Sequence, residues 1–248
     1  MATIPRILYM LWLQGERPGI VRMNFERWAR LNPNYRLEIL DQSAALAVLA
    51  GLPLKLDQLT PQALSDVLRL RLLHKTGGIW ADATVFPAKP LDDWLPQLIT
   101  PSGFFAFERP KPDRPISSWF LAATPDNAMI RAWWQKVLDY WSVPRTLRKG
   151  IPDDPVAADA TWPDLYPYFW LHYIFQMLVD RDADFAQDWA ACAKLSADAP
   201  LTMQRLMSEN SRSTSLEEII RLVDQAPVHK LNWRASYPME LLVQLSKR

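Results

Sequence analysis

The order of apolar and polar positions predicts an α/β protein. The unbroken apolar run Ile7–Leu13 is typical of a strand buried on both faces, and residues 35–41 alternate as a second strand does. A third strand is expected over Gly78–Phe86, directly after a glycine pair. Helical periodicity covers residues 21–31, 44–50 and 61–76. Alternating strands and helices within about 80 residues predict a parallel, nucleotide-binding type of sheet.

The remainder of the chain is expected to be mostly helical. Two further strands are predicted over residues 103–108 and 116–123, with the proline-rich residues 109–115 between them. We expect the long proline-rich, charged segment 143–167 to form a loop. Later apolar stripes predict helices near 129–140, 170–178, 183–195 and 202–223, and a last strand-like piece over 228–233. The pattern indicates one domain over residues 1–248: a mixed sheet flanked by helices, with a helix-rich C-terminal half.

Composition narrows the function classes. A net charge of +1 argues against a chain-wide electrostatic grip on nucleic acid. Cys192 is the single cysteine, so no internal disulfide can form and a reducing, cytoplasmic compartment is expected. The run Ile7–Leu13 is too short to span a membrane and lacks a signal cleavage site. Twelve tryptophans are many for 248 residues and hint at carbohydrate binding, although most should fill the core.

The residues with the clearest chemical potential surround the predicted third strand. Asp82 follows the Gly77–Gly78 pair and sits near the end of the apolar run, where a carboxylate would reach the ligand edge of an open sheet. The alternative is an ordinary turn in which Asp82 only caps the following loop. Asp66 and Arg69 stand three residues apart on the preceding helix and can share a face. By themselves they would most often form a solvated ion pair.

Five segments together resemble the capsular polysaccharide synthesis glycosyltransferases and, more distantly, fungal outer-chain mannosyltransferases and glucosylating clostridial toxins. They are residues 4–12, 65–69, 77–84, 116–120 and 229–233. The resemblance implies a GT-A fold and transfer of a hexose from a nucleotide-sugar donor, with UDP and retention favoured. The acceptor would be an oligosaccharide or lipid-linked glycan of a bacterial surface polysaccharide, met at the inner membrane face through peripheral contact. Residues 1–124 would bind the donor and residues 125–248 the acceptor.

The resemblance also implies a donor site and a metal ion. Asp82 matches the first carboxylate of the DXD motif, but Thr84 stands where the second is usual, which weakens the expected Mn²⁺ or Mg²⁺ site. His229 is the expected distal metal ligand, the alternative being a solvated His–Lys pair. Catalytic roles are expected for Asp82, Arg69 and His229. The donor-binding residues implied are Trp12, Asp66, Arg69, Gly78, Asp82, Thr84, Ser117, Ser118, Lys230 and Trp233.

Acceptor contacts are expected from the long loop and from an aromatic helix. Asp153 and Asp154 belong to the loop, which would otherwise be solvated, and His172 is alternatively a core residue. Two rival functions stay open at this point. One is a non-catalytic nucleotide-sugar or glycan-binding protein, which the missing second aspartate favours. The other is a hydrolase that pairs Asp153 with Asp82.

Overall fold

The centre of the protein is a five-stranded mixed sheet. The computed structural model describes residues 3–151, 161, 163–209, 215–235, 243–245 and 247. The sheet has the order β2–β1–β3–β6–β5. Its strands are β1 (Ile7–Leu11), β2 (Arg36–Leu40), β3 (Gly78–Ala81), β5 (Phe104–Lys111) and β6 (Arg114–Ala123). β1 pairs in parallel with β2 and β3, whereas β6 is antiparallel to β3 and β5. The predicted parallel rhythm therefore holds only for the first three strands.

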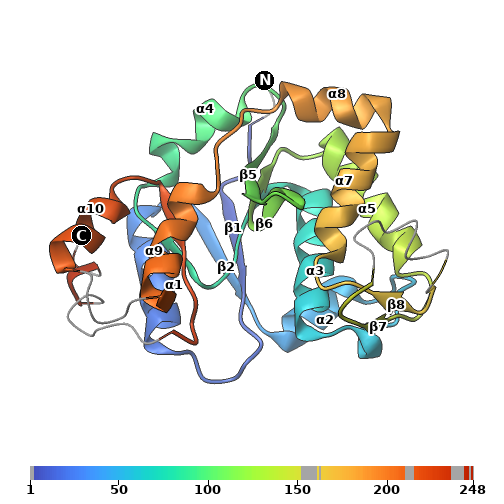
Figure 1. Cartoon of the computed structure of the whole chain (residues 1–248), viewed down its shortest axis with the longest axis horizontal. Helices are drawn as coiled ribbons and strands as arrows, with labels where there is room; N and C mark the ends of the chain where they lie inside the picture. Colours follow the sequence, from blue (N-terminus) through green and yellow to red (C-terminus); the bar gives the residue numbers. More distant parts are fainter. Residues whose placement is uncertain are drawn as a thin grey trace.

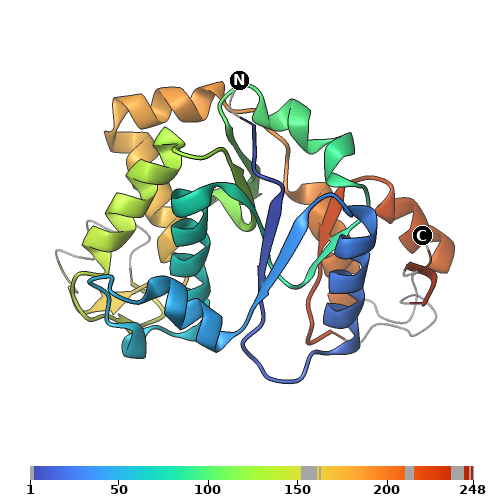
Figure 2. The ribbon, with the colours of Figure 1, turned by 180° about the vertical axis from the view of Figure 1, so that it is seen from behind.

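Helices cover both faces of this sheet (Figure 1). Side chains alternate along β1, so that Leu8 and Met10 enter one core and Tyr9 and Leu11 the other. One face carries α2 (Gln42–Leu49), α3 (Pro61–Thr76), α5 (Ala128–Tyr140), α7 (Trp170–Arg181) and α8 (Ala183–Ala191); the other carries α1 (Gly19–Leu31), η2 (Leu91–Asp93), α4 (Leu95–Ile99), α9 (Asp198–Glu209) and α10 (Leu216–Val223). Seen from behind, α1 and α3 lie on opposite sides of β1 (Figure 2). Two buried faces explain the unbroken apolar run.

None of the helices among the described residues combines the length and the apolar character needed to cross a membrane. The C-terminal half is helix-rich as predicted, with α5 and α7 to α10 following the last strand of the central sheet. The short 3₁₀ turn η1 (Leu56–Gln58) leads into α3.

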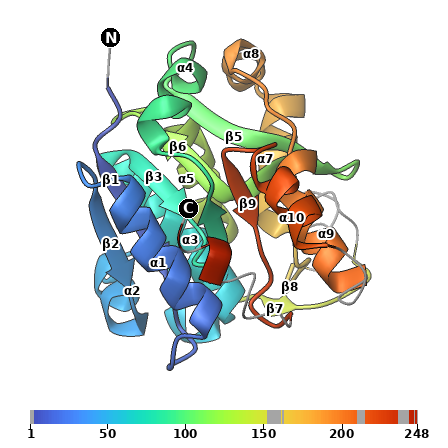
Figure 3. The same ribbon diagram turned by 90° about the vertical axis from the view of Figure 1, so that its left-hand side faces the viewer.

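The strand predicted over residues 78–86 is in fact two strands. β3 ends at Ala81, and the backbone turns at Asp82, whose carbonyl accepts from the Val85 N–H at 2.8 Å. β4 (Val85–Pro87) then leaves the central sheet and pairs antiparallel with β9 (Val228–Lys230). Figure 3 shows β9 between α1 on one side and α9 and α10 on the other. The break takes Asp82 out of the sheet and brings β9 beside it.

The proline-rich residues 109–115 also differ from the prediction. β5 runs on to Lys111 and β6 begins at Arg114, so the segment is the end of a long hairpin rather than a separating loop. The pairing register shifts on either side of Glu108, and Arg109 has a φ of 48°. Farther along, β7 (Thr146–Leu147) and β8 (Leu165–Tyr166) pair in parallel within the predicted loop. The predicted helix over 202–223 is divided into α9 and α10.

The glycine pair is required by close packing at the start of β3. Gly77 has a φ of 68°, and a Cβ there would lie 2.7 Å from the Pro125 nitrogen and 2.9 Å from the Ala123 carbonyl oxygen. Gly78 has a φ of 103°, and its Cβ would lie 3.0 Å from the Ile7 carbonyl oxygen. Any other residue would strain the backbone and separate the strands beside β3.

We therefore predict that Gly77→Ala lowers the free energy of unfolding by at least about 2 kcal/mol, because a left-handed backbone and backbone clashes add together. Gly19→Ala is the matched control, since nothing lies within 4 Å of a Cβ built there. Urea unfolding of both variants gives the comparison. Equal stabilities would contradict the packing argument.

Candidate functional site

A cavity of about 550 Å³ opens at the edge of the sheet where β1 and β3 end. Residues 11–14, which end and follow β1, and residues 82–84, which follow β3, line it. Residues 117–119 join them because β6 is antiparallel to β3, with Phe120 opposite Ala81. The rest of the lining comes from the face of α3, the end of the β5–β6 hairpin, the segment before α7 with the start of that helix, α9, and residues 230–234 at the end of β9 and beyond it. Open α/β sheets commonly bind ligands at this edge.

Asp82 is held in a fixed orientation at the centre of the cavity wall. Its Oδ1 accepts from Arg69 Nη2 at 3.2 Å and from Trp80 Nε1 at 3.0 Å. Its Oδ2 lies 3.4 Å from the Lys230 ammonium nitrogen. The backbone is fixed as well, since the Asp82 N–H donates to the Trp119 carbonyl at 2.9 Å. The alternative interpretation, in which Asp82 only caps the following loop, does not account for these contacts.

Arg69 is the most heavily bonded side chain of the site. Its guanidinium, only 5% exposed, pairs with Asp66 at 2.8 Å and with Asp82 at 3.2 Å. It also donates to Ser65 Oγ and to the Ser118 carbonyl, both at 3.0 Å, and lies over the Trp80 ring. Arg69 thus connects α3 to β3 and β6. The predicted sharing of a helix face by Asp66 and Arg69 is confirmed, but their ion pair is buried rather than solvated.

Burial has a large effect on Asp66. Desolvation raises the pKa of its carboxyl group to about 6, against the lowering effect of the neighbouring Arg69 charge, while Asp82 adds a smaller upward shift. The Asp66 carboxyl group therefore gains or loses its proton near pH 6, well above the usual range of an aspartate.

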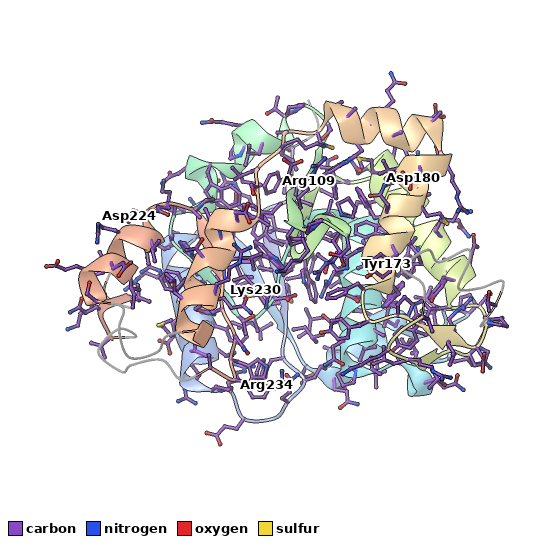
Figure 4. The ribbon with its side chains drawn as sticks, in the orientation of Figure 1. Arg109, Tyr173, Asp180, Asp224, Lys230 and Arg234 are labelled. Atoms are coloured by element: carbon purple, nitrogen blue, oxygen red, sulfur yellow. The ribbon has the colours of Figure 1, made fainter. Side chains whose placement is uncertain are left out.

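Lys230 and Thr84 form the other side of the Asp82 environment. The ammonium group of Lys230 donates to the hydroxyl of Thr84, a buried residue, in addition to its contact with Asp82. Figure 4 shows Lys230 near the middle of the molecule, with Arg234 below it. The β4–β9 pairing sets this arrangement, because Lys230 lies opposite Val85 and the Leu231 N–H donates to the Thr84 carbonyl at 2.9 Å.

Two tryptophans form one end of the cavity. Trp12 follows β1 and Trp233 follows β9; their rings are nearly perpendicular, with centroids 5.5 Å apart. Below the centre, Ser117 and Ser118 are buried in β6, and Trp119 stacks on Phe107 at 5.0 Å. The structure therefore brings these predicted donor residues to the lining of one cavity.

The opposite side of the cavity is aromatic and includes His172. Burial, together with the charges of Arg69 and Arg114, lowers the pKa of His172 to about 3, so the imidazole is neutral. Tyr168 is 53% exposed and meets the Phe169 ring edge-on at 4.9 Å. The Arg114 guanidinium covers Phe169 at 3.8 Å. These residues belong to the β5–β6 hairpin, the start of α7 and the segment before it.

The family of the chain follows from comparison with known sequences. Residues 2–149 match the family described as capsular polysaccharide synthesis protein. The chain belongs to this family. The Saccharomyces cerevisiae protein HOC1, provisionally described as a glycosyltransferase, is 24% identical over 106 residues, which are 40% of this chain and 27% of HOC1. The family match ends before Tyr168, His172, Lys230 and Trp233, whose place in the site rests on the structure alone.

Solved glycosyltransferase structures show distant overall similarity. The PaToxG glycosyltransferase is 15% identical with a TM-score of 0.48, over 91% of this chain and 89% of its own. A glycosyltransferase involved in glycosylation of the major capsid of PBCV-1 is 12% identical with a TM-score of 0.48, over 98% and 100%. The galactosyltransferase LgtC, with donor and acceptor sugar analogues, is 9% identical with a TM-score of 0.46, over 97% and 95%.

Two predicted site residues lie elsewhere. His229 is fully buried, its Nε2 is 3.0 Å from the Val223 carbonyl, and it does not line the cavity. Side chains alternate along a strand, so when Lys230 faces Asp82, His229 must face the opposite core. Gly78 begins β3, at the far end from Asp82, and is also absent from the lining. The structure therefore contradicts the predicted catalytic and metal-binding roles of His229 and the predicted donor contact of Gly78. Asp153 and Asp154 lie outside the described residues.

The donor set does not fit the predicted Mn²⁺ or Mg²⁺. No group of three His, Cys, Asp or Glu side chains in the described part of the chain is placed to hold a metal ion. Asp66 and Asp82 are separated by Arg69, and Lys230 lies against the remaining oxygen of Asp82. A unit charge 4 Å from a like charge near a protein surface is repelled by about 4 kcal/mol, and a divalent ion by twice that.

Several lining residues were missed by the sequence analysis. Lys111 and Arg114 come from the end of a hairpin where the sequence predicted a connection between two strands, and Tyr168 and Phe169 begin the aromatic segment from which only His172 was selected. Arg234 immediately follows the predicted Trp233, and its guanidinium lies 4.4 Å from that ring. Their cationic and aromatic character was visible in the sequence, but the folding that gathers them was not.

The raised pKa of Asp66 predicts an unusual pH dependence of stability. The folded protein holds this proton up to about pH 6, whereas an unburied aspartate has a pKa of 3.8, so stability falls as the pH rises through this interval. In Asp66→Asn this loss is absent. Between about pH 4 and about pH 7.5 we expect the variant to gain roughly 2 kcal/mol relative to the wild type in urea unfolding.

Asp92→Asn provides a control of opposite sign. A hydrogen bond from Tyr35 lowers the pKa of Asp92, so its contribution is present at neutral pH and is lost on acidification. Parallel pH profiles of wild type and Asp66→Asn would contradict the burial of an ionised Asp66.

Proposed function

We propose that this protein is a glycosyltransferase that moves a hexose from a nucleotide-sugar donor, most simply UDP-linked, to a glycan acceptor in surface polysaccharide synthesis. The observation that supports it most directly is Asp82, held at the ligand edge of the sheet between Arg69 and Lys230. Membership of the capsular polysaccharide synthesis family supports the role in surface polysaccharide synthesis.

The cavity has the chemistry that a nucleotide-sugar requires. Among the residues that line it, five are cationic and two are carboxylates, and this excess of positive charge favours a diphosphate. The cations are Arg69, Lys111, Arg114, Lys230 and Arg234, and the carboxylates are Asp66 and Asp82. Carboxylate oxygens accept from ribose or sugar hydroxyls, and Oδ2 of Asp82 has acceptor capacity beyond its contact with Lys230, whereas Oδ1 already accepts from Arg69 and Trp80. Aromatic rings at Trp12 and Trp233 suit stacking on a base.

In the proposed reaction the bond between the anomeric carbon and the diphosphate oxygen breaks, and its electron pair stays on that oxygen. The acceptor hydroxyl oxygen forms the new bond to the anomeric carbon, and its proton passes to the departing diphosphate. Negative charge develops on the leaving group, so fixed positive groups beside it lower the barrier. Arg69 and Lys230 are placed to supply this charge. We favour retention of configuration, since no second carboxylate among the described lining residues is free of Arg69 to act as a base.

The acceptor is proposed to enter from the side of Tyr168. Its exposed ring offers a flat apolar surface for a pyranose, and its partly buried hydroxyl lies in the field of Asp66 and Asp82. Both burial and these charges raise the pKa of Tyr168, so the hydroxyl stays protonated and can donate a hydrogen bond. Neutral His172 provides a further polar contact on this side. A free oligosaccharide and a lipid-linked glycan both satisfy this chemistry.

A direct test is release of UDP from a panel of UDP-hexoses, with and without an oligosaccharide acceptor. Asp82→Asn should lower the rate by about 100-fold or more, because it removes the charge that orients Arg69 and Lys230. Asp93→Asn changes an exposed carboxylate in η2 and should leave the rate unchanged. Tight UDP-sugar binding without any turnover would instead identify a non-catalytic nucleotide-sugar-binding protein.

A second prediction concerns the place where the nucleotide base of the donor binds. Trp12→Ala should weaken UDP binding by about 5- to 100-fold, as expected for loss of a stacking partner. Inorganic pyrophosphate has no base, so its affinity should not change. Isothermal titration with both ligands distinguishes the two effects. Equal weakening of UDP and pyrophosphate would show that Trp12 only supports the local structure.

A further inference from the structure

Lys230 lies between the two positions of the DXD motif, Asp82 and Thr84. Its ammonium group contacts Asp82 Oδ2 and the hydroxyl of Thr84, the residue at the second DXD position. Lys230 is partly exposed to the cavity, with 20% of its side chain accessible, so a ligand can reach it. Lys230 therefore contacts a carboxylate at the first DXD position and, at the second, the hydroxyl of Thr84 that stands in place of a carboxylate.

We propose that the ammonium group of Lys230 replaces the divalent cation, so that this enzyme binds and cleaves its nucleoside diphosphate sugar without a metal ion. The inference rests on the proposed function and defines how the same site holds its donor. Thr84 is the necessary complement, because a neutral hydroxyl accepts a hydrogen bond from the ammonium group and leaves its charge free for the diphosphate.

The backbone makes the lysine a fixed part of the site. β9 pairs with β4 in antiparallel register, with Lys230 opposite Val85. The Leu231 N–H bond to the Thr84 carbonyl continues the pairing beyond the strand. Moving the chain by one residue would bring His229 toward Asp82, but its fully buried ring is packed on the other face. The register therefore selects an ammonium group rather than an imidazole ligand.

The charges of the site agree with this assignment. Around the reacting centre, Arg69 and Lys230 balance Asp66 and Asp82. Lys111, Arg114 and Arg234 add positive charge elsewhere in the lining, enough to meet the two negative charges of a donor diphosphate. A bound donor thus finds compensating charge among the protein side chains themselves.

The group transfer step remains balanced with a lysine in this position. When the anomeric carbon–oxygen bond breaks, the electron pair goes to the diphosphate oxygen and the ammonium group stabilises it by charge and hydrogen bonding. The acceptor hydroxyl, or water during donor hydrolysis, forms the new bond and its proton goes to the departing diphosphate. Lys230 keeps its own proton throughout.

The first experiment measures UDP affinity of the full chain by isothermal titration in EDTA and in Mn²⁺. For the wild type we expect less than about a threefold difference between the two conditions. Lys230→Ala should lose about tenfold or more of its UDP affinity in EDTA, as expected for loss of a charged contact. Lys89→Ala, at an exposed lysine that does not line the cavity, is the matched control and should bind as the wild type does.

The second experiment asks whether metal dependence can be created. The double variant Thr84→Asp/Lys230→Ala has two carboxylates in DXD spacing and no competing ammonium group. Mn²⁺ should tighten its UDP binding by about tenfold or more, while EDTA should reverse the effect. Because Thr84 is buried, circular dichroism and thermal unfolding should accompany the titration. If this variant does not fold, the Lys230→Ala titration in EDTA still decides the question.

The outcomes separate this inference from the proposed function. A wild type that binds UDP only with Mn²⁺, or a Lys230→Ala variant that keeps full affinity in EDTA, would overturn the lysine assignment and leave the glycosyltransferase proposal intact. A wild type that binds no nucleotide in either condition would overturn both.

Discussion

The site depends on one carboxylate held between two cations. Asp82 receives Arg69 and Trp80 on one oxygen and Lys230 on the other, and these three partners come from α3, β3 and β9. A buried or partly buried charge is tolerated only when such partners are present. The carboxylate therefore does more than face a ligand, because it also fixes where the two cations point. Removing it would leave Arg69 with Asp66 and Lys230 with a hydroxyl.

This constraint explains why the third strand is interrupted. An unbroken strand over residues 78–86 would place Asp82 and Thr84 on the same face as Trp80 and bury both in that core, where neither could reach a ligand. The turn after Ala81 instead places both residues in the lining of the cavity, and β4 leaves the central sheet to pair with β9. Upstream, the glycine pair lets β3 lie close to its neighbours, so the edge from which Asp82 emerges is rigid.

Much of the fold could be predicted from the sequence, since the signals were local. The apolar run of β1, the proline at the start of α3 and the glycine at its end are determined by nearby residues and by burial on both faces. The break in β3 was missed because Ala83 and Val85 are as apolar as a continuous strand would be. Both strands of the β5–β6 hairpin were predicted, but their extension through residues 109–115 was missed because the prolines lie where the pairing is irregular.

The site was predicted in part for the same reason. Periodicity placed Asp66 and Arg69 on one helix face and Asp82 near the end of a strand, and the family resemblance then joined the three in one donor site. His229 and Lys230 are adjacent, so the choice between them depended on strand register, which a distant pairing decides. Tyr168 and the hairpin cations depend entirely on tertiary contacts. No local pattern specifies which distant segments close a cavity.

The β4–β9 pairing has a consequence for the order in which the site is completed. Val85 and Lys230 lie opposite each other in the β4–β9 pair, yet most of the polypeptide must be synthesised before they can meet. During translation the N-terminal strands and α3 can assemble around Arg69 and Asp82 while the ammonium group is still missing. Until β9 docks, Arg69 alone faces Asp66 and Asp82, so this cluster keeps a net negative charge, and the cation beside Asp82 Oδ2 is added last.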